Sequence, residues 1–281
     1  MNNLNINSQL GYYLAGLIEG DGNIWTSKEL RSKSGRIHNP QIIFTFHKKE
    51  LPLFKHLKDL FNSGSLYVVK DTNVGKYRIS ETKVLINLIN LINGKFRTPK
   101  LYYLYRAIDH INIVHDANII KLPLDTSNLA DNAWLAGMTD ADGNFHISLE
   151  GVYGLNGSTV RGRVKCTFSI AQRLIDKATA LSCEPFMREI ADLFECNINY
   201  KSNAITFLAQ SDSKHFLTKY YFDNYPLMTS KHLNYLSFLQ GLNFLGKRLT
   251  DKEIVKIRNI KNSMNNKRTY YSWYHLNNFY V

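Results

Sequence analysis

Two aspartates, Asp21 and Asp142, each follow a run of small and apolar residues and precede a glycine. Residues 11–23 recur as residues 132–144, an offset of 121 positions in a chain of 281. A single Asp-Gly after a helix is usually only a cap and a turn. Two matched copies, each joining small residues to a terminal Asp-Gly, exceed what turn chemistry explains, and they indicate a paired carboxylate site.

The residues before each aspartate have helical spacing. Gly16 and Gly20 lie four apart, as do Gly137 and Ala141 in the second copy. Small residues at this spacing share one helix face and let two helix backbones approach closely. We therefore expect the two helices to pack against each other and join the two halves of the chain.

Such packing would place Asp21 and Asp142 at the C-terminal tips of two adjoining helices. Each tip already carries about half a negative charge and unpaired carbonyls. Like-charge crowding either raises the carboxylate pKa values or attracts cations. The two carboxylates and the free carbonyls of Gly20 and Ala141 form a set of hard oxygen ligands that suits Mg²⁺. Two or more divalent ions that activate water and stabilise a leaving oxygen would hydrolyse phosphodiester bonds.

The elements around the aspartates also repeat. Gly22 and Gly143 are predicted to end the motif helices in the left-handed conformation. Strands are expected at 23–29, 39–47, 65–70 and 76–80, and at 144–153, 159–173, 198–201 and 204–209; helices are expected at 53–61, 82–93 and 99–113, and at 186–194, 211–221 and 230–242. Each half therefore has the order αββαββα. We predict an α+β fold of two pseudo-symmetric halves, each an antiparallel four-stranded sheet backed by helices and joined at the paired motif helices.

The same pattern divides the chain. The N-terminal half covers residues 1–116, a linker 117–130, the C-terminal half 131–245, and a helical, basic extension of unassigned role 246–281.

Composition restricts the partners. The chain has 35 Lys and Arg against 23 Asp and Glu, a formal charge of +12, which indicates a polyanionic partner. No apolar run reaches the roughly 18 residues that a membrane helix needs. Three cysteines, an odd number without zinc-ligand spacing, argue against a disulfide scaffold and a structural zinc site. We find no secretory signal or basic transit peptide, and 29 asparagines indicate AT-rich codons. These features favour an organelle-encoded protein that acts in the mitochondrion.

Alternating polar residues on the strands predict a DNA-binding face. One side of each expected strand is apolar, while the other carries side-chain types that read base edges in the major groove. The candidates are Trp25, Ser27, Gln41, Thr45, Lys76, Arg78 and Ser80 in the first half, and His146, Ser148, Glu150, Arg161, Arg163, Lys165 and Thr167 in the second.

The repeated segments, residues 14–22 and 135–143, resemble the two signatures of the LAGLIDADG homing endonucleases in their single-chain, double-motif form. The resemblance extends over about residues 8–245. It implies that the motif helices form the interface between the halves and that the eighth motif position, Asp21 and Asp142, carries the metal-binding catalytic carboxylate. The sixth position, Glu19 and Asp140, is acidic in the family and more structural.

Three further positions follow from the resemblance. A glutamine near the end of the second strand, which orders water in the family, corresponds to Gln172, whereas the first half has Phe46 followed by His47. A basic residue before the final helix corresponds to Lys100 and Lys231. The resemblance implies that Gln172, Lys100 and Lys231 form a polar pocket around the carboxylates and stabilise charge on the scissile phosphates.

The sequence thus predicts a monomeric, Mg²⁺-dependent endonuclease that cuts both strands of DNA at a long asymmetric site and promotes mobility of its own intron. An RNA maturase that assists splicing of its host intron, with or without cleavage activity, is the first alternative, and intron RNA would then be the partner. A catalytically silent DNA-binding module is the second. A membrane-surface protein is a distant third, because no basic amphipathic helix with an apolar aromatic face stands out.

Overall fold

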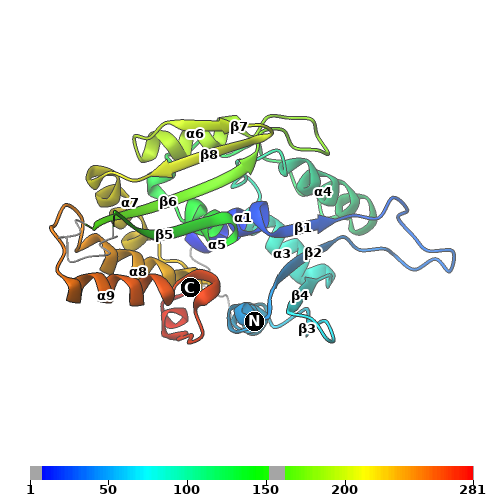
Figure 1. Ribbon diagram of the computed structural model, residues 1–281. Helices are drawn as coiled ribbons and strands as arrows, with labels where there is room; N and C mark the ends of the chain where they lie inside the picture. Colours follow the sequence, from blue (N-terminus) through cyan, green and yellow to red (C-terminus); the bar gives the residue numbers. More distant parts are fainter. Residues whose placement is uncertain (1–7, 152–161, 281) are drawn as a thin grey trace.

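Two adjoining helices, α1 (Ser8–Gly20) and α5 (Trp134–Asp142), lie at the centre of the molecule. In the computed structural model, which describes residues 8–151 and 162–280, a four-stranded antiparallel sheet extends from each of them (Figure 1). No helix among these described residues is long and apolar enough to cross a membrane.

The two sheets have the same strand order. The first is β1 (Gly22–Trp25), β2 (Gln41–His47), β4 (Val74–Ile79) and β3 (Ser65–Val68); the second is β5 (Gly143–Glu150), β6 (Arg163–Arg173), β8 (Ala204–Ala209) and β7 (Ile198–Lys201). The helices of the first half are α2 (Leu51–Phe61), α3 (Thr82–Ile92) and α4 (Leu101–His115); those of the second are α6 (Glu184–Leu193), α7 (Asp212–Asn224) and α8 (Lys231–Leu242). The predicted α+β class and the αββαββα order of both halves are confirmed.

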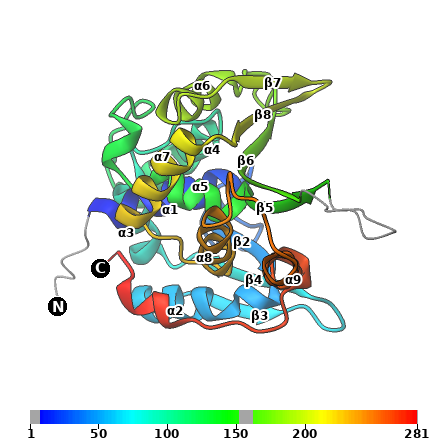
Figure 2. The same ribbon diagram turned by 60° about the vertical axis from the view of Figure 1, so that its left-hand side comes forward.

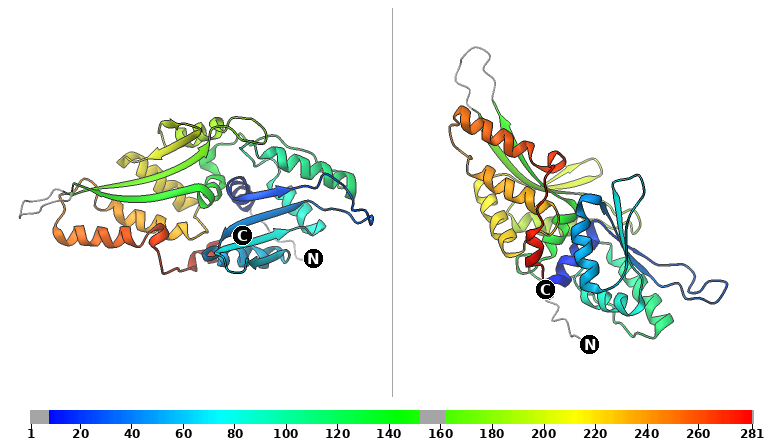
Figure 3. Two further views of the ribbon diagram at one scale, coloured as in Figure 1. Left: turned by 45° about the vertical axis from the view of Figure 1, so that its right-hand side comes forward. Right: turned by 90° about the horizontal axis from the view of Figure 1, so that it is seen from below.

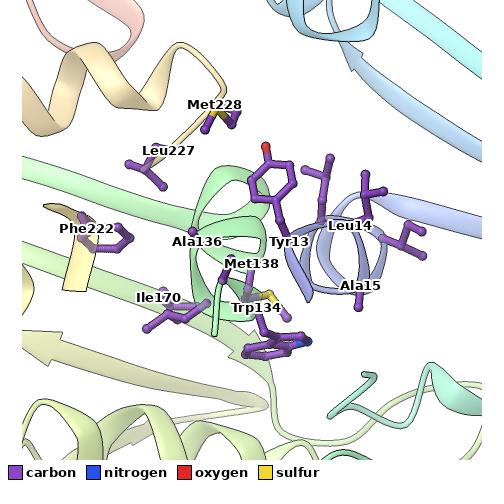
Figure 4. Packing of buried hydrophobic residues seen from close by; sticks show 14 of the residues in the cluster. Tyr13, Leu14, Ala15, Trp134, Ala136, Met138, Ile170, Phe222, Leu227 and Met228 are labelled. Atoms are coloured by element: carbon purple, nitrogen blue, oxygen red, sulfur yellow. The ribbon is translucent and has the colours of Figure 1, made fainter. Parts of the chain in front are cut away.

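Glycines allow the two central helices to touch. A Cβ atom at Gly16 would lie 2.0 Å from the carbonyl oxygen of Trp134, and one at Gly137 would lie 1.9 Å from that of Tyr13. No side chain fits in such a space, so the expected close approach of the motif helices is confirmed. The close-up in Figure 4 shows Tyr13 and Trp134 on opposite sides of this contact, among buried apolar residues.

The glycines after the motif helices have a different role from the predicted one. Gly143 is extended, with φ −74° and ψ 155°, and Gly22 is not among the glycines with positive φ. The left-handed stop is therefore wrong at both positions. A Cβ at Gly22 would lie 2.6 Å from the Cα of Ile18, and one at Gly143 would lie 2.5 Å from Thr139. Glycine is required here because each first strand starts directly against the last helical turn.

The first strand of the N-terminal half is shorter than expected. β1 ends at Trp25, and the chain leaves the sheet as an extended arm that turns at residues 32–36 and returns at β2. Backbone bonds from Ser32 to Arg36 and from His38 to Leu30 close this arm. Figure 1 shows it projecting from the sheet at the right of the view.

The C-terminal residues connect both halves. Helix α9 (Asp251–Asn262) packs against α8 and β5 of the second half. After the short turns η3 (Asn265–Lys267) and η4 (Tyr274–Asn278), the chain reaches the first half. There the rings of Phe279 and Tyr280 lie 5.9 and 5.1 Å from the ring of Tyr13. Figure 2 shows the red C-terminal segment beside α2.

Candidate active site

Asp21 and Asp142 lie at the adjacent ends of α1 and α5, and both side chains remain exposed. The carboxylate of Asp142 approaches to within 3.1 Å of where a Cβ at Gly20 would lie, so it reaches across to the other helix. Partial burial and the nearby Asp142 raise the pKa of Asp21 to about 6, although Lys231 and Lys100 oppose the shift. The expected like-charge crowding therefore occurs at Asp21.

Lys100 closes the C-terminal end of α1. Its Nζ atom donates hydrogen bonds to the carbonyl oxygens of Ile18, Gly20 and Gly22, at 3.1, 3.0 and 2.9 Å. Burial lowers the pKa of Lys100, while nearby carboxylates oppose that shift. An ammonium group has three donors, so this lysine uses two of them on the end of α1 and the third on the first residue of β1.

Lys231 has the same position at α5. Its Nζ donates to the carbonyl oxygens of Thr139 and Ala141 at 3.1 and 2.5 Å, and burial lowers its pKa. The carbonyls of Gly20 and Ala141 are therefore not free, contrary to the sequence-based expectation, because the lysines stabilise the helix ends. A carbonyl oxygen has two lone pairs, so each retains one acceptor site.

The two halves differ beside the carboxylates. Gln172 donates from Nε2 to Asp142 at 2.7 Å, which fits the position expected for the family glutamine. In the first half Phe46 is buried, and its ring stacks on Phe54 with centroids 3.9 Å apart. His47 is exposed, and its Nδ1 accepts a hydrogen bond from the backbone two residues later.

Two pockets flank the carboxylate pair. One, of about 420 Å³, is lined by Asp142 and Gln172 together with Gly20 and Lys100; we call it the Asp142 pocket. The other, of about 320 Å³, is the Asp21 pocket, and its lining includes Asp21, Phe46, His47, Ala141 and Lys231. Each pocket thus combines a carboxylate from one half with a lysine and a helix-end carbonyl from the other.

The acidic residues at the sixth motif position, Glu19 and Asp140, hold the chain segments that precede the two pocket lysines. Glu19 is buried and accepts hydrogen bonds from the backbone N–H groups of Arg97 and Thr98 and from the indole Nε1 of Trp134. Burial raises its pKa to about 7. Glu19 therefore holds the segment that presents Lys100 and at the same time binds the opposite motif helix.

Asp140 is the counterpart in the second half. It accepts from the Tyr13 hydroxyl at 2.8 Å and from the N–H groups of Met228 and Thr229 at 2.6 and 3.2 Å. Tyr13 and Trp134 occupy matched positions of the repeat, so the two halves exchange equivalent hydrogen bonds. The sequence interpretation missed this pair, although a hydrogen-bonding aromatic residue at the same position of both copies was the available signal.

Two other contacts across the halves have no counterpart in the repeat. Glu50, just before α2, accepts a hydrogen bond from the backbone N–H of Ser230 at 2.8 Å. Arg97 donates to Glu189 of α6 at 2.7 Å. Such long-range contacts have no local sequence signal, and they hold the second half in position over the first.

Strand register gathers most predicted DNA-binding residues of the first half on the open face of its sheet. Thr45 lies opposite Lys76, and Trp25 lies opposite Gln41. Arg78 lies two residues after Lys76 and shares its face. Ser27 follows the end of β1 and Ser80 follows the end of β4, so neither belongs to the sheet itself.

The open face of the second half has the predicted register. Its cross-strand pairs are His146 with Thr167, Ser148 with Lys165, and Glu150 with Arg163. Alternate residues of β6 are buried against the helices. Arg161 lies outside the described residues. Figure 3 shows that the two sheets curve away from the central helices on the same side of the molecule.

Comparison with known proteins identifies the family of this chain. A family model described as LAGLIDADG endonuclease matches residues 14–110 and 135–242. The chain belongs to the LAGLIDADG endonuclease family. The "Intron-encoded DNA endonuclease aI3" of Saccharomyces cerevisiae is 30% identical over 99% of this chain and 75% of its own length. The "Uncharacterized cox1 intron-2 37.2 kDa protein" of Schizosaccharomyces pombe is 31% identical over 89% of this chain and 71% of its own length.

The fold is also that of solved LAGLIDADG structures. The I-LtrWI homing endonuclease bound to target DNA superimposes with a TM-score of 0.68 at 20% identity, covering 93% of this chain and 99% of that one. Endonucleases of the family depend on divalent metal ions. In the described part of this chain, no group of three or more His, Cys, Asp or Glu side chains is placed to hold a metal. Two exposed carboxylates beside helix-end carbonyls nevertheless match the oxygen ligands of a hard cation that keeps several waters.

Proposed function

We propose that this protein is a monomeric, Mg²⁺-dependent homing endonuclease that makes a double-strand break in DNA at the insertion site of its own intron. The observation that carries the proposal is the pair of pockets at the junction of the halves, each containing an aspartate, a lysine and a helix-end carbonyl. Two pockets related by pseudo-twofold symmetry match the two antiparallel strands of a duplex, so each pocket acts on one strand.

Asp21 and Asp142 would hold the divalent ions, with Gly20 and Ala141 presenting their remaining carbonyl lone pairs. When bound, these ions activate the attacking water and stabilise the leaving oxygen. The raised pKa of Asp21 fits this role, because a bound cation would offset both the burial and the repulsion from Asp142 that disfavour the ionised carboxylate. Gln172 orients the carboxylate of Asp142 through their hydrogen bond and leaves its amide oxygen to position water.

The lysines act through their charge. Lys100 uses all three of its donors on carbonyls, so it stabilises the scissile phosphate by its field rather than by a direct hydrogen bond. Lys231 donates to two carbonyls and has one donor left for a phosphate oxygen. Buried cations beside a reacting phosphate are worth more than exposed ones because little water screens them.

The open sheet faces would hold the DNA. β6 has 11 residues and the equivalent strand β2 has 7, so at ~3.3 Å per residue they span about 11 and about 7 base pairs at ~3.4 Å each. The two halves together would cover about 18 pairs. Their different side chains, such as Trp25 with Gln41 in one half and Ser148 with Lys165 in the other, predict an asymmetric site.

The test is to incubate the purified protein with Mg²⁺ and a duplex containing the uninterrupted insertion site of its gene. We expect cleavage of both strands near the centre of the site, and none in a duplex with scrambled central base pairs. Ca²⁺ should allow binding without cleavage, because its looser geometry does not reproduce the octahedral coordination of Mg²⁺. Binding without cleavage in both metals would instead indicate a silent DNA-binding module.

We also propose that the protein is encoded in an organelle intron and acts in the mitochondrion. The support is the asparagine-rich composition and the intron-encoded relatives, one of them named for a cox1 intron. Assistance in splicing stays the alternative. A splicing assay of the host intron, with and without the protein, would reveal it.

A further inference from the structure

The Asp21 pocket lacks the glutamine that the Asp142 pocket contains. Gly22 pairs with Phe44, and Gly143 pairs with Ile170. The residues two positions further along the same strands, Phe46 and Gln172, are therefore equivalent. The Phe46 ring is buried and stacked on α2, so it offers no group that could orient water or phosphate beside Asp21.

The C-terminal extension supplies polar groups to this pocket instead. Asn265 and Asn266, in the turn after α9, line the Asp21 pocket. No residue of the extension that the structure describes lines the Asp142 pocket. Among the described residues, the C-terminal extension thus enters only the pocket in which Phe46 takes the place of the amide side chain.

The turn that carries Asn266 is anchored firmly. The backbone N–H of Asn265 donates to Oδ1 of Asn234 at 2.9 Å, and its side-chain Nδ2 donates to the carbonyl of Phe145 at 3.0 Å. Asn265 has φ +54°, a conformation that asparagine tolerates better than most residues. Arg268 fixes the other side of the turn through hydrogen bonds to the Leu233 carbonyl and the Ser237 hydroxyl.

The end of the extension is anchored as well. The Tyr280 hydroxyl donates to the Pro226 carbonyl at 2.7 Å, and the Phe279 ring lies 4.8 Å from the ring of His56 in α2. With Asn265 held on the second half and Phe279 on the first, the extension crosses the junction beside the Asp21 pocket. Asn266 itself is exposed and makes no hydrogen bond within the described residues, so its amide is available.

We propose that Asn266 is a positioning residue of the Asp21 pocket, where its amide orients the attacking water or the scissile phosphate as Gln172 does in the other pocket. This inference rests on the proposed endonuclease function. His47 also lines the pocket, but its Nδ1 accepts a backbone N–H, so it could offer only Nε2 and has no amide group. The two pockets are therefore completed by amides from different parts of the chain, a strand in one and the extension in the other.

The test is strand-resolved, single-turnover cleavage of the insertion-site duplex, with each strand labelled separately. We expect Asn266→Ala to slow cleavage of one strand roughly tenfold, because misplacing a reactant can cost up to about 10²-fold, and nicked DNA to accumulate. Gln172→Ala should slow the opposite strand. Asn266→Gln keeps the amide and should restore most of the lost rate. Asn259→Ala, an exposed change on α9, is the matched control and should leave both strands unaffected.

The ratio of the two strand rates separates positioning from stability, since a loss of folded protein slows both strands equally. Equal slowing of both strands by Asn266→Ala, or no slowing, would overturn the inference. Slowing of the same strand as Gln172→Ala would also overturn it, because the two amides would then serve one pocket. Cleavage by the wild-type protein in the same assay tests the proposed endonuclease function separately. If the wild-type protein does not cut, both the proposed function and the inference about Asn266 lose their basis.

Discussion

The Asp142 pocket and the Asp21 pocket share a carboxylate, a lysine and a helix-end carbonyl, but their walls differ. Gln172 faces Asp142, whereas the equivalent Phe46 is packed into the core and asparagines of the extension line the Asp21 pocket. The repeat is retained where packing permits one solution, as at Gly16, where a Cβ would lie 2.0 Å from a backbone oxygen. It has diverged where a pocket wall can be built in more than one way.

Removing either carboxylate is the largest expected effect. Asp21→Asn or Asp142→Asn keeps the shape but removes a proposed metal ligand, and we expect cleavage to fall on the order of 10³-fold or more, as for loss of an essential catalytic group. DNA affinity should change only a few-fold, since phosphate contacts supply most of it. Asp71→Asn, in the exposed turn between β3 and β4, is the control. Full cleavage by both single variants would contradict the assignment of the two aspartates as metal ligands.

Separating the helices should affect both pockets together. Gly16→Leu or Gly137→Leu forces a side chain into backbone, and overpacking costs about 1–3 kcal/mol or more. We expect a melting temperature lower by several degrees and slower cleavage of both strands. Asn90→Leu, on the exposed side of α3, is a control for the added hydrophobic side chain. An unchanged melting temperature in both glycine variants would mean that the motif helices do not meet there.

Base reading should distinguish the two halves of the target. Arg163→Ala and Arg78→Ala are each expected to lose about 1–3 kcal/mol and to relax preference at one or two base pairs, in opposite half-sites. A phosphate contact would instead weaken binding evenly and reduce the salt slope by about one. Glu150 lies opposite Arg163 on the neighbouring strand. We expect Glu150→Gln to change the sequence specificity more than the affinity for DNA. A cleavage profile over every single-base variant measures these effects, and profiles identical to wild type would exclude these faces as the reading surface.

The smallest expected effect is on stability in the absence of metal. The pKa of Asp21 is raised from 3.8 to about 6. The contribution of protonated Asp21 to the free energy of unfolding is therefore fully present below about pH 4 and is lost as the pH rises through 6. Asp21→Asn should therefore match wild type at pH 4 and melt higher above pH 6. After allowance for solvent screening, we expect the variant to be more stable than wild type by about 1 kcal/mol, which corresponds to a melting temperature higher by roughly 2–4 °C. Adding Mg²⁺ should reduce the difference by stabilising wild type. Equal melting temperatures throughout would contradict the raised pKa.

Local patterns carried most of the fold. Alternation along the strands placed Lys165 and Arg163 on the open face, and small residues four apart placed α1 against α5. Both signals depend on neighbours in sequence, so a single chain contains them. The extent of β1 was overestimated because its alternation continues into the arm, where no partner strand forms a ladder with it.

Contacts between distant segments could not be predicted in the same way. Nothing near Glu50 indicates that it meets Ser230, and nothing near Asn266 indicates that it lines the pocket of Asp21. Gly22 and Gly143 were correctly singled out, but for a turn conformation rather than for the close start of a strand against the preceding helix. The distinction depends on a three-dimensional approach that spacing does not encode.

In this account the two pockets hold metal through equivalent carboxylates although their walls differ. The most direct test is a crystal structure with target DNA and Mn²⁺, a metal that anomalous scattering locates. We predict metal ions about 2.1 Å from oxygens of both Asp21 and Asp142, with Gln172 beside one pocket and Asn266 beside the other. Metal bound away from both aspartates, or at one aspartate alone, would contradict this account.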